Sequence, residues 1–214
     1  MNMPDHKPFA TATLRLARRV ALPLAFPLLS LLAAPAAFAL ADTGKAELQA
    51  VQGRWADIHY GLPEKHREAA FAELAERAAR AVAVEPEAAE LRIWHAIALS
   101  TWAGAKGGLG LVKEARTELE TALRLDPRAL DGSAYTSLGS LYYQVPGWPL
   151  GFGDDAQAEK LLKQALAINR GGIDPNYFYG DFLSRQKRYA EARTALEKAL
   201  AAPDRPGRAS ADAG

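Results

Sequence analysis

The segment Asp174–Asp204, DPNYFYGDFLSRQKRYAEARTALEKALAAPD, decides the fold. Asp174 followed by Pro175 is a typical helix start, because Asp accepts hydrogen bonds from free amides and Pro fits the first turn. Apolar side chains at helical spacing follow, and then comes the polar turn SRQKR. Ala192, Leu196 and Ala199 lie on one face of a second helix. Two short amphipathic helices with a tight turn predict an antiparallel hairpin.

The same pattern recurs upstream in DGSAYTSLGSLYY and AQAEKLLKQALAIN. Gly139 aligns with Gly180, and Leu162 aligns with Leu196. The distance from the glycine to the first aligned alanine is 12 residues in the last hairpin and 19 residues here. The upstream copy therefore carries seven extra residues, which fall in the loop VPGWPLGFGDD.

Further copies predict the domain organisation. VKEARTELETALRLDP continues the pattern behind AAELRIWHAIALSTW, with AGAKGGLGL between them, and a more degenerate pair precedes it. The tail is rich in Ala, Pro and Gly, which predicts disorder. We expect a helical pair at 42–85, three hairpins at 86–204 (two with lengthened loops), and a disordered tail at 205–214.

These features resemble the tetratricopeptide repeat, a helix–turn–helix unit of about 34 residues. The last hairpin matches the pattern of that family at Gly180, Ala192, Leu196 and Ala199, with Pro203 one residue early. The resemblance implies an all-α fold, a right-handed α-solenoid of tetratricopeptide-like hairpins. It also implies a concave face lined by the first helices. The middle copy departs from the pattern at Arg170, where a proline is usual.

The first 41 residues are typical of a cleaved signal peptide. Three arginines (Arg15, Arg18 and Arg19) precede an apolar run, and two A-x-A sites end at Ala39 and Ala41. We favour cleavage after Ala41, which predicts a periplasmic protein. The prolines in the apolar run disfavour the alternative, an uncleaved membrane anchor.

Composition excludes several classes of function. The chain of 214 residues has no cysteine, so disulfides, thiolate chemistry and a lipid anchor on Cys are excluded. Its formal net charge of +1 indicates no nucleic-acid partner. The histidines lack metal-ligand spacing, and GAKGGLGLVKE fails both phosphate-loop patterns. We expect no enzyme activity, no cofactor and no metal. Asp154 is expected to cap a helix, with Gln157 three residues on.

Repeat positions on the first helices give candidate contacts for a protein or peptide, because they mix aromatic, hydroxyl and charged groups. They are Thr136, Tyr143, Gln144, Tyr177, Asp181 and Arg185. Trp148 and Phe152 either close the top of their hairpin over Tyr142 and Tyr143 or form an edge of the binding site. The last helix either presents an apolar face to a second subunit or is polar enough to end the array.

The signal, the repeats and the loop LYYQVPGWPLGFGD also resemble periplasmic repeat proteins such as the component associated with TRAP transporters. Members of that family assemble with a solute-binding protein, and many carry a lipid-modified Cys, which this chain lacks. The first hypothesis is thus a non-enzymatic scaffold that binds a protein or peptide. The alternative is a small-molecule-binding accessory component of a periplasmic transporter, with a solute-binding protein as partner.

Overall fold

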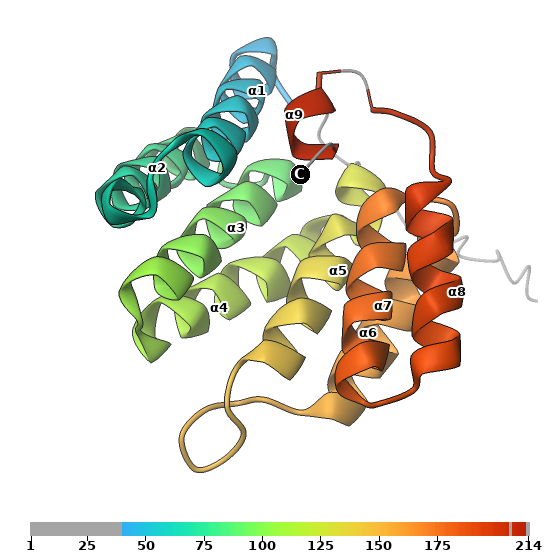
Figure 1. The fold of residues 1–214 in the computed structure, drawn as a ribbon. Coiled ribbons are helices and arrows are strands. Elements are labelled where there is room, and N and C mark those ends of the chain that lie inside the picture. Colours follow the sequence, from blue (N-terminus) through green and yellow to red (C-terminus); the bar gives the residue numbers. More distant parts are fainter. Residues whose placement is uncertain (1–39, 206, 213–214) are drawn as a thin grey trace, which may run out of the picture. The chain divides into compact units, whose positions relative to one another are not determined.

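The computed structural model describes residues 40–205 and 207–212, which form a series of antiparallel helical hairpins (Figure 1). The predicted signal peptide lies outside the described residues, apart from Leu40 and Ala41. The first helices are α1 (Asp42–Ala56, followed by the π-helical turn η1, Asp57–Gly61), α3 (Ala89–Lys106), α5 (Ala129–Gln144) and α7 (Ile173–Arg185). The second helices are α2 (Glu64–Val84), α4 (Leu109–Leu125), α6 (Asp155–Ile168) and α8 (Tyr189–Leu200). A short α9 (Ala209–Asp212) follows.

Each hairpin packs on the next one. The first helices contact one another in series, α1 with α3, α3 with α5 and α5 with α7. Each second helix also contacts the first helix that follows it, as α4 contacts α5. This is the arrangement of an all-α solenoid, in which repeats bury their apolar faces against neighbours.

Two glycines set the spacing inside the last two hairpins. A Cβ at Gly139 would lie 2.8 Å from Leu162 Cγ, and a Cβ at Gly180 would lie 2.7 Å from Leu196 Cγ. Ordinary carbon–carbon contacts are about 3.5–4.0 Å, so only glycine permits this approach. The structure thus confirms the alignment of these two copies, including the leucine that fills each crossing.

The connection between α3 and α4 differs from the expected long loop. α3 continues to Lys106 and α4 begins at Leu109, so only Gly107 and Gly108 join them. Gly107 has a φ of 75°, a left-handed conformation that glycine adopts without steric cost. The extra residues of this copy therefore lengthen its helices rather than its turn.

Two further sequence expectations concern Asp174 and the tail. Gly172, not Asp174, is the N-cap of α7, which leaves the carboxylate of Asp174 available for other contacts. Residues 205–214 were expected to be disordered on composition. The described part of this tail instead folds back and forms α9, held by an ion pair between Arg205 and Asp174. Composition gave no indication of this pairing across the fold.

Candidate functional site

The accessible face of α5 and α7 carries a connected cluster of polar and aromatic side chains. The hydroxyl of Tyr143 donates a hydrogen bond of 2.7 Å to Asp181 Oδ2, and Arg185 Nε donates to the same oxygen at 3.2 Å. The Arg185 guanidinium also lies 5.1 Å from the centre of the Tyr143 ring. Gln144 Nε2 donates to the Tyr143 hydroxyl at 3.3 Å. The structure thus brings together four of the six first-helix residues that the sequence singled out.

Electrostatics suit this cluster to recognition. Burial raises the pKa of the Tyr143 hydroxyl, and its hydrogen bond to the carboxylate of Asp181 raises it further. Tyr143 therefore remains a neutral donor, which makes it a poor base or nucleophile. Arg185 is tethered by Asp181 yet half exposed, so its remaining N–H groups can reach a partner.

The two other first-helix candidates have different surroundings. Tyr177 on α7 is 52% exposed, and its ring packs edge-on against Phe178 at 5.3 Å. It is therefore available on the surface. Thr136 is only 3% exposed, because α5 is flanked by both α3 and α7. Thr136 is thus a packing residue and does not belong to the accessible face.

The two aromatic residues in the long loop of the α5–α6 hairpin have different surroundings. Phe152 packs edge-on against Tyr142 at 5.4 Å, and the guanidinium of Arg116 lies 5.0 Å from the Phe152 ring. Trp148 is 90% exposed and covers neither tyrosine. Phe152 thus closes the hairpin as one hypothesis expected, whereas Trp148 extends into solvent. Asp154 caps α6 as predicted, accepting a hydrogen bond from the Gln157 amide.

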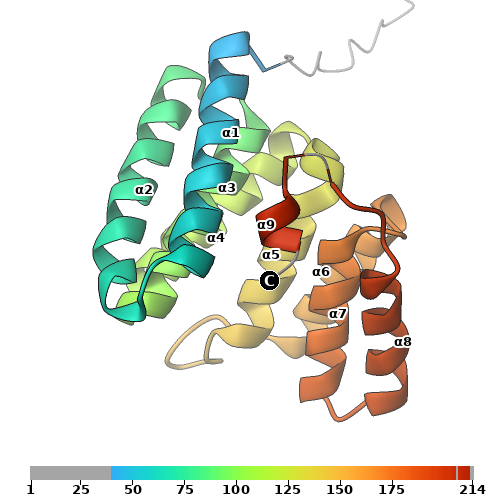
Figure 2. The same ribbon diagram turned by 45° about the horizontal axis from the view of Figure 1, so that its top comes forward.

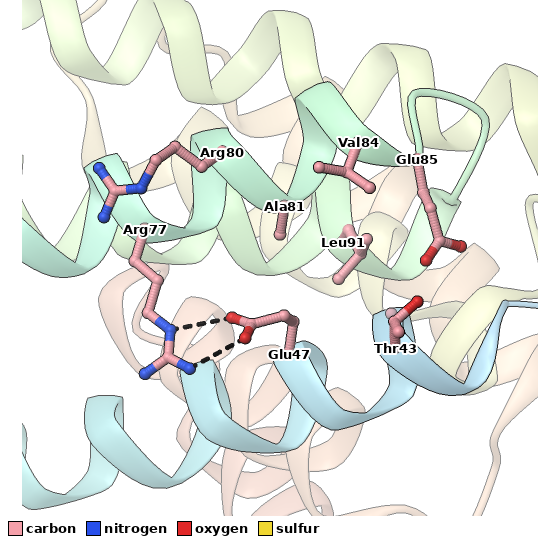
Figure 3. Close-up of a pocket in the computed structure, with 9 residues that line it drawn as sticks. Thr43, Glu47, Arg77, Arg80, Ala81, Val84, Glu85 and Leu91 are labelled. Atoms are coloured by element: carbon pink, nitrogen blue, oxygen red, sulfur yellow. Dashed lines mark hydrogen bonds and ion pairs between the residues drawn. The ribbon is translucent and has the colours of Figure 1, made fainter.

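A surface cavity of about 400 Å³ lies between α1 and α2 (Figure 3). Arg77 reaches across it from α2 and donates two hydrogen bonds to Glu47 on α1, Nε to Oε2 at 2.9 Å and Nη2 to Oε1 at 3.2 Å. These bonds lower the pKa of the Glu47 carboxyl. Arg77 is engaged by Glu47, whereas Arg80, the other cation of this cavity, is 71% exposed and pairs only at 3.9 Å with Glu76.

Comparison with known proteins identifies the repeat. Residues 150–211 match a family model described as tetratricopeptide repeat. This stretch is similar to the tetratricopeptide repeat. A solved structure of a thermophilic TPR protein from Thermus thermophilus superposes with a TM-score of 0.57. The two proteins share 23% identity, and the match covers 78% of each chain, so it supports the fold.

A second solved structure and a search of curated proteins were also compared with this chain. A structure of pilF from Pseudomonas aeruginosa is 14% identical over 77% of this chain and 78% of its own, with a TM-score of 0.36. A search of curated proteins found no significant relative. The tetratricopeptide repeat fold suggests a protein-interaction scaffold, and the cluster of Tyr143, Asp181 and Arg185 lies on the first helices.

We also searched the described residues for a metal site and for a membrane-spanning helix. No group of three or more His, Asp or Glu residues there could hold a metal ion. Within the same residues, no helix combines the length and apolar character needed to cross a membrane. His95 is buried inside the repeat array.

Sequence reasoning missed one part of the first-helix face. Tyr60 on η1 and Trp94 on α3 contact the returning tail through Ala211 and Arg208. Tyr60 belongs to the degenerate pair at 42–85, where no family position marks it. The only signal in the sequence was the pair of arginines, Arg205 and Arg208, in a tail of otherwise small residues.

Proposed function

We propose that this chain is an exported tetratricopeptide repeat protein that binds a segment of another protein on the face of its first helices. The observation that carries the proposal is the cluster of Tyr143, Gln144, Asp181 and Arg185, which joins two successive first helices at the surface. Aromatic and arginine side chains dominate the energetics of protein interfaces. A site of this composition suits a peptide with mixed polar and apolar groups.

The role we propose is that of a non-enzymatic scaffold. Rigid placement of the binding groups lowers the entropy that a partner must lose on binding. Tyr143 is held by Asp181, and Asp181 is also held by Arg185 four residues further along the same helix. Such a network presents fixed donors and acceptors to an incoming chain.

Export is part of the proposal and rests on the sequence of residues 1–41. The fold bears on the choice between the two candidate cleavage sites. Leu40 is buried, and the amide of Ala41 donates to Glu85 at 3.1 Å. Cleavage after Ala39 keeps both contacts, whereas cleavage after Ala41 removes them. We therefore favour the earlier site, and N-terminal sequencing of protein from a periplasmic extract tests both the export and the site.

An affinity capture experiment tests the binding face. Wild-type protein and a Tyr177→Ala/Arg185→Ala double variant are used as bait in periplasmic extract. We expect the wild type to retain a protein that the double variant loses. Tyr189→Ala/Arg193→Ala is the matched control, because it removes the same two residue types from α8, where both side chains are exposed. Equal capture by both double variants would contradict binding on the first-helix face.

A second candidate function is a small-molecule-binding accessory role beside a transporter, for which we consider the cavity between α1 and α2. The cavity between α1 and α2 has a volume of about 400 Å³, within the range of ligand pockets. Its exposed Arg80 would favour an anionic solute. A rise in Tm with carboxylate or phosphate compounds, lost in Arg80→Ala, would support this role over the scaffold.

A further inference from the structure

The C-terminal tail crosses the face of the first helices. After α8 the chain turns back, and α9 lies near α7 on one side and near α3 and η1 on the other (Figure 2). Three separate contacts hold it there, and they come from parts of the chain that are up to 151 residues apart. The tail therefore occupies part of the surface on which a partner is proposed to bind.

Arg205 makes the first contact. Its guanidinium donates to Asp174 on α7, Nη1 to Oδ2 at 2.6 Å and Nη2 to Oδ1 at 3.2 Å. The same guanidinium pairs with Asp212 at the end of the tail, through Nε at 3.0 Å and through Nη2. This two-pronged geometry is the one in which arginine binds carboxylates most strongly. Asp174 thus provides an anchoring carboxylate on the face of the repeats.

Arg208 makes the second contact, against an aromatic surface. Its guanidinium lies 5.0 Å from the centre of the Trp94 ring, a cation–π arrangement. Trp94 is itself held edge-on by Trp55 at 6.1 Å, and Trp55 stacks on His59 at 4.7 Å. The ring that receives Arg208 is therefore fixed by the packing of α1, η1 and α3.

Tyr60 makes the third contact, with the backbone of the tail. Its hydroxyl donates to the carbonyl oxygen of Ala211 at 3.3 Å. A bond to a backbone carbonyl recognises the path of a peptide chain whatever its side chains are. Tyr60 also stands edge-on to Trp55 at 6.0 Å, so it belongs to the same aromatic group as Trp94.

Trp94 and Asp174 together favour positively charged side chains in the segment that docks on them. Burial lowers the pKa of Arg208, and the nearby charge of Arg205 lowers it further, so placing two arginines together here is unfavourable in itself. The aromatic ring of Trp94 and the carboxylate of Asp174 offset that cost. A surface that accepts two cations three residues apart is built for a segment of that kind.

We infer that Trp94, Tyr60 and Asp174 form a binding site for a peptide segment with two arginines three residues apart, and that the chain's own tail occupies this site until a partner displaces it. The inference rests on the proposed function, because it names the chemistry of the bound segment and adds a competitor. A tethered tail has a high effective concentration at its site, so a partner in solution must compete with it.

A peptide-binding measurement tests the inference. The probe is a synthetic peptide, PDRPGRASADAG, which corresponds to residues 203–214, labelled at its N-terminus. Fluorescence anisotropy compares the unmodified protein with an Arg205→Ala/Arg208→Ala variant, whose tail lacks both cations. We expect the variant to bind the probe with an apparent Kd at least ten-fold lower, because its site is vacated. A probe with both arginines replaced by alanine should not bind.

Second-site variants locate the binding. Adding Asp174→Asn to the vacated protein should weaken probe binding at least ten-fold. Adding Asp155→Asn is the matched control, because it removes the same charge from α6, where the carboxylate accepts a hydrogen bond from Gln186. That control should leave the Kd within about two-fold. Circular dichroism melts of each variant confirm folding.

A second measurement does not depend on the double variant. Because Arg208 packs on Trp94 in the docked tail, we expect trypsin to cleave after Arg208 faster once the tail is released, so Asp174→Asn should speed that cleavage at least ten-fold over the unmodified protein. If the probe fails to bind the vacated protein and cleavage rates are equal, the inference is overturned. The proposed function stands or falls separately, on whether the Tyr177→Ala/Arg185→Ala variant loses its captured partner.

Discussion

Replacing Gly180 with alanine tests whether the close approach of α7 to Leu196 on α8 requires a residue without a side chain. An added Cβ would lie 2.7 Å from Leu196 Cγ and 3.3 Å from the Ala192 carbonyl oxygen. Overpacking of this kind costs roughly 1–3 kcal/mol, while the better helix propensity of alanine returns about 1 kcal/mol. We expect the free energy of unfolding to fall by up to about 2 kcal/mol. For a chain of this size each kcal/mol corresponds to about 2–4 °C in Tm.

Urea denaturation followed by far-UV circular dichroism measures the change, and Gly53 provides the control. Gly53 lies in α1, and beyond its chain neighbours and its own helix backbone no described atom lies within 4 Å of an added Cβ there. Gly53→Ala should therefore raise the free energy of unfolding by about 0.5–1 kcal/mol. In a Leu196→Ala background the obstacle is absent, so Gly180→Ala should become stabilising there. A stabilising effect of Gly180→Ala in the wild-type background would refute the argument from close packing.

Three other predictions concern stability. Phe152→Ala should lower the free energy of unfolding by about 2–3 kcal/mol because a packed ring is lost, whereas Trp148→Ala should change it by less than about 0.5 kcal/mol; urea titration of both variants checks the contrast. Asp154→Ala should cost about 1 kcal/mol, because it removes the cap of α6, and no loss of stability in thermal melts would contradict the capping role. Hydrogen bonds from Arg188 and Lys163 hold the pKa of Glu159 at about 2, below the ordinary value of 4.5. The stability that this carboxylate contributes is present above pH 4.5 and is lost as the pH falls toward 2, so Glu159→Gln should flatten the decline of Tm in that window; an unchanged slope would count against the ion pair.

The sequence predicted the repeat array because small-residue spacing reports a local event, the crossing of two adjacent helices. Gly139 and Gly180 carried that information, and the structure places a leucine against each of them. Repeat positions also marked Tyr143, Asp181 and Arg185 as candidates on the first helices, and the structure brings them together because residues of successive first helices are neighbours.

The sequence did not predict features that depend on contacts between distant parts of the chain. Thr136 has the repeat position of a surface residue, but packing of α5 between α3 and α7 buries it. The docking of Arg205 on Asp174 joins the tail to a helix that begins 32 residues earlier, and no periodic pattern reports such a pairing. The sequence left two roles open for Trp148, packing over its hairpin or forming an edge of the binding site, and the structure leaves the side chain 90% exposed.

The docked tail also bears on how the molecule unfolds. Solenoids are stabilised by contacts between nearest neighbours, so their ends can open while the middle stays folded. Here Tyr60, near the start of the described chain, bonds to Ala211, near its end, and Arg205 secures α7 in between. Opening at either end must first break this link, so the terminal hairpins should exchange their amide protons in a more concerted way than an open array would. Release of the tail would return the protein to the graded, end-first opening of an ordinary repeat array.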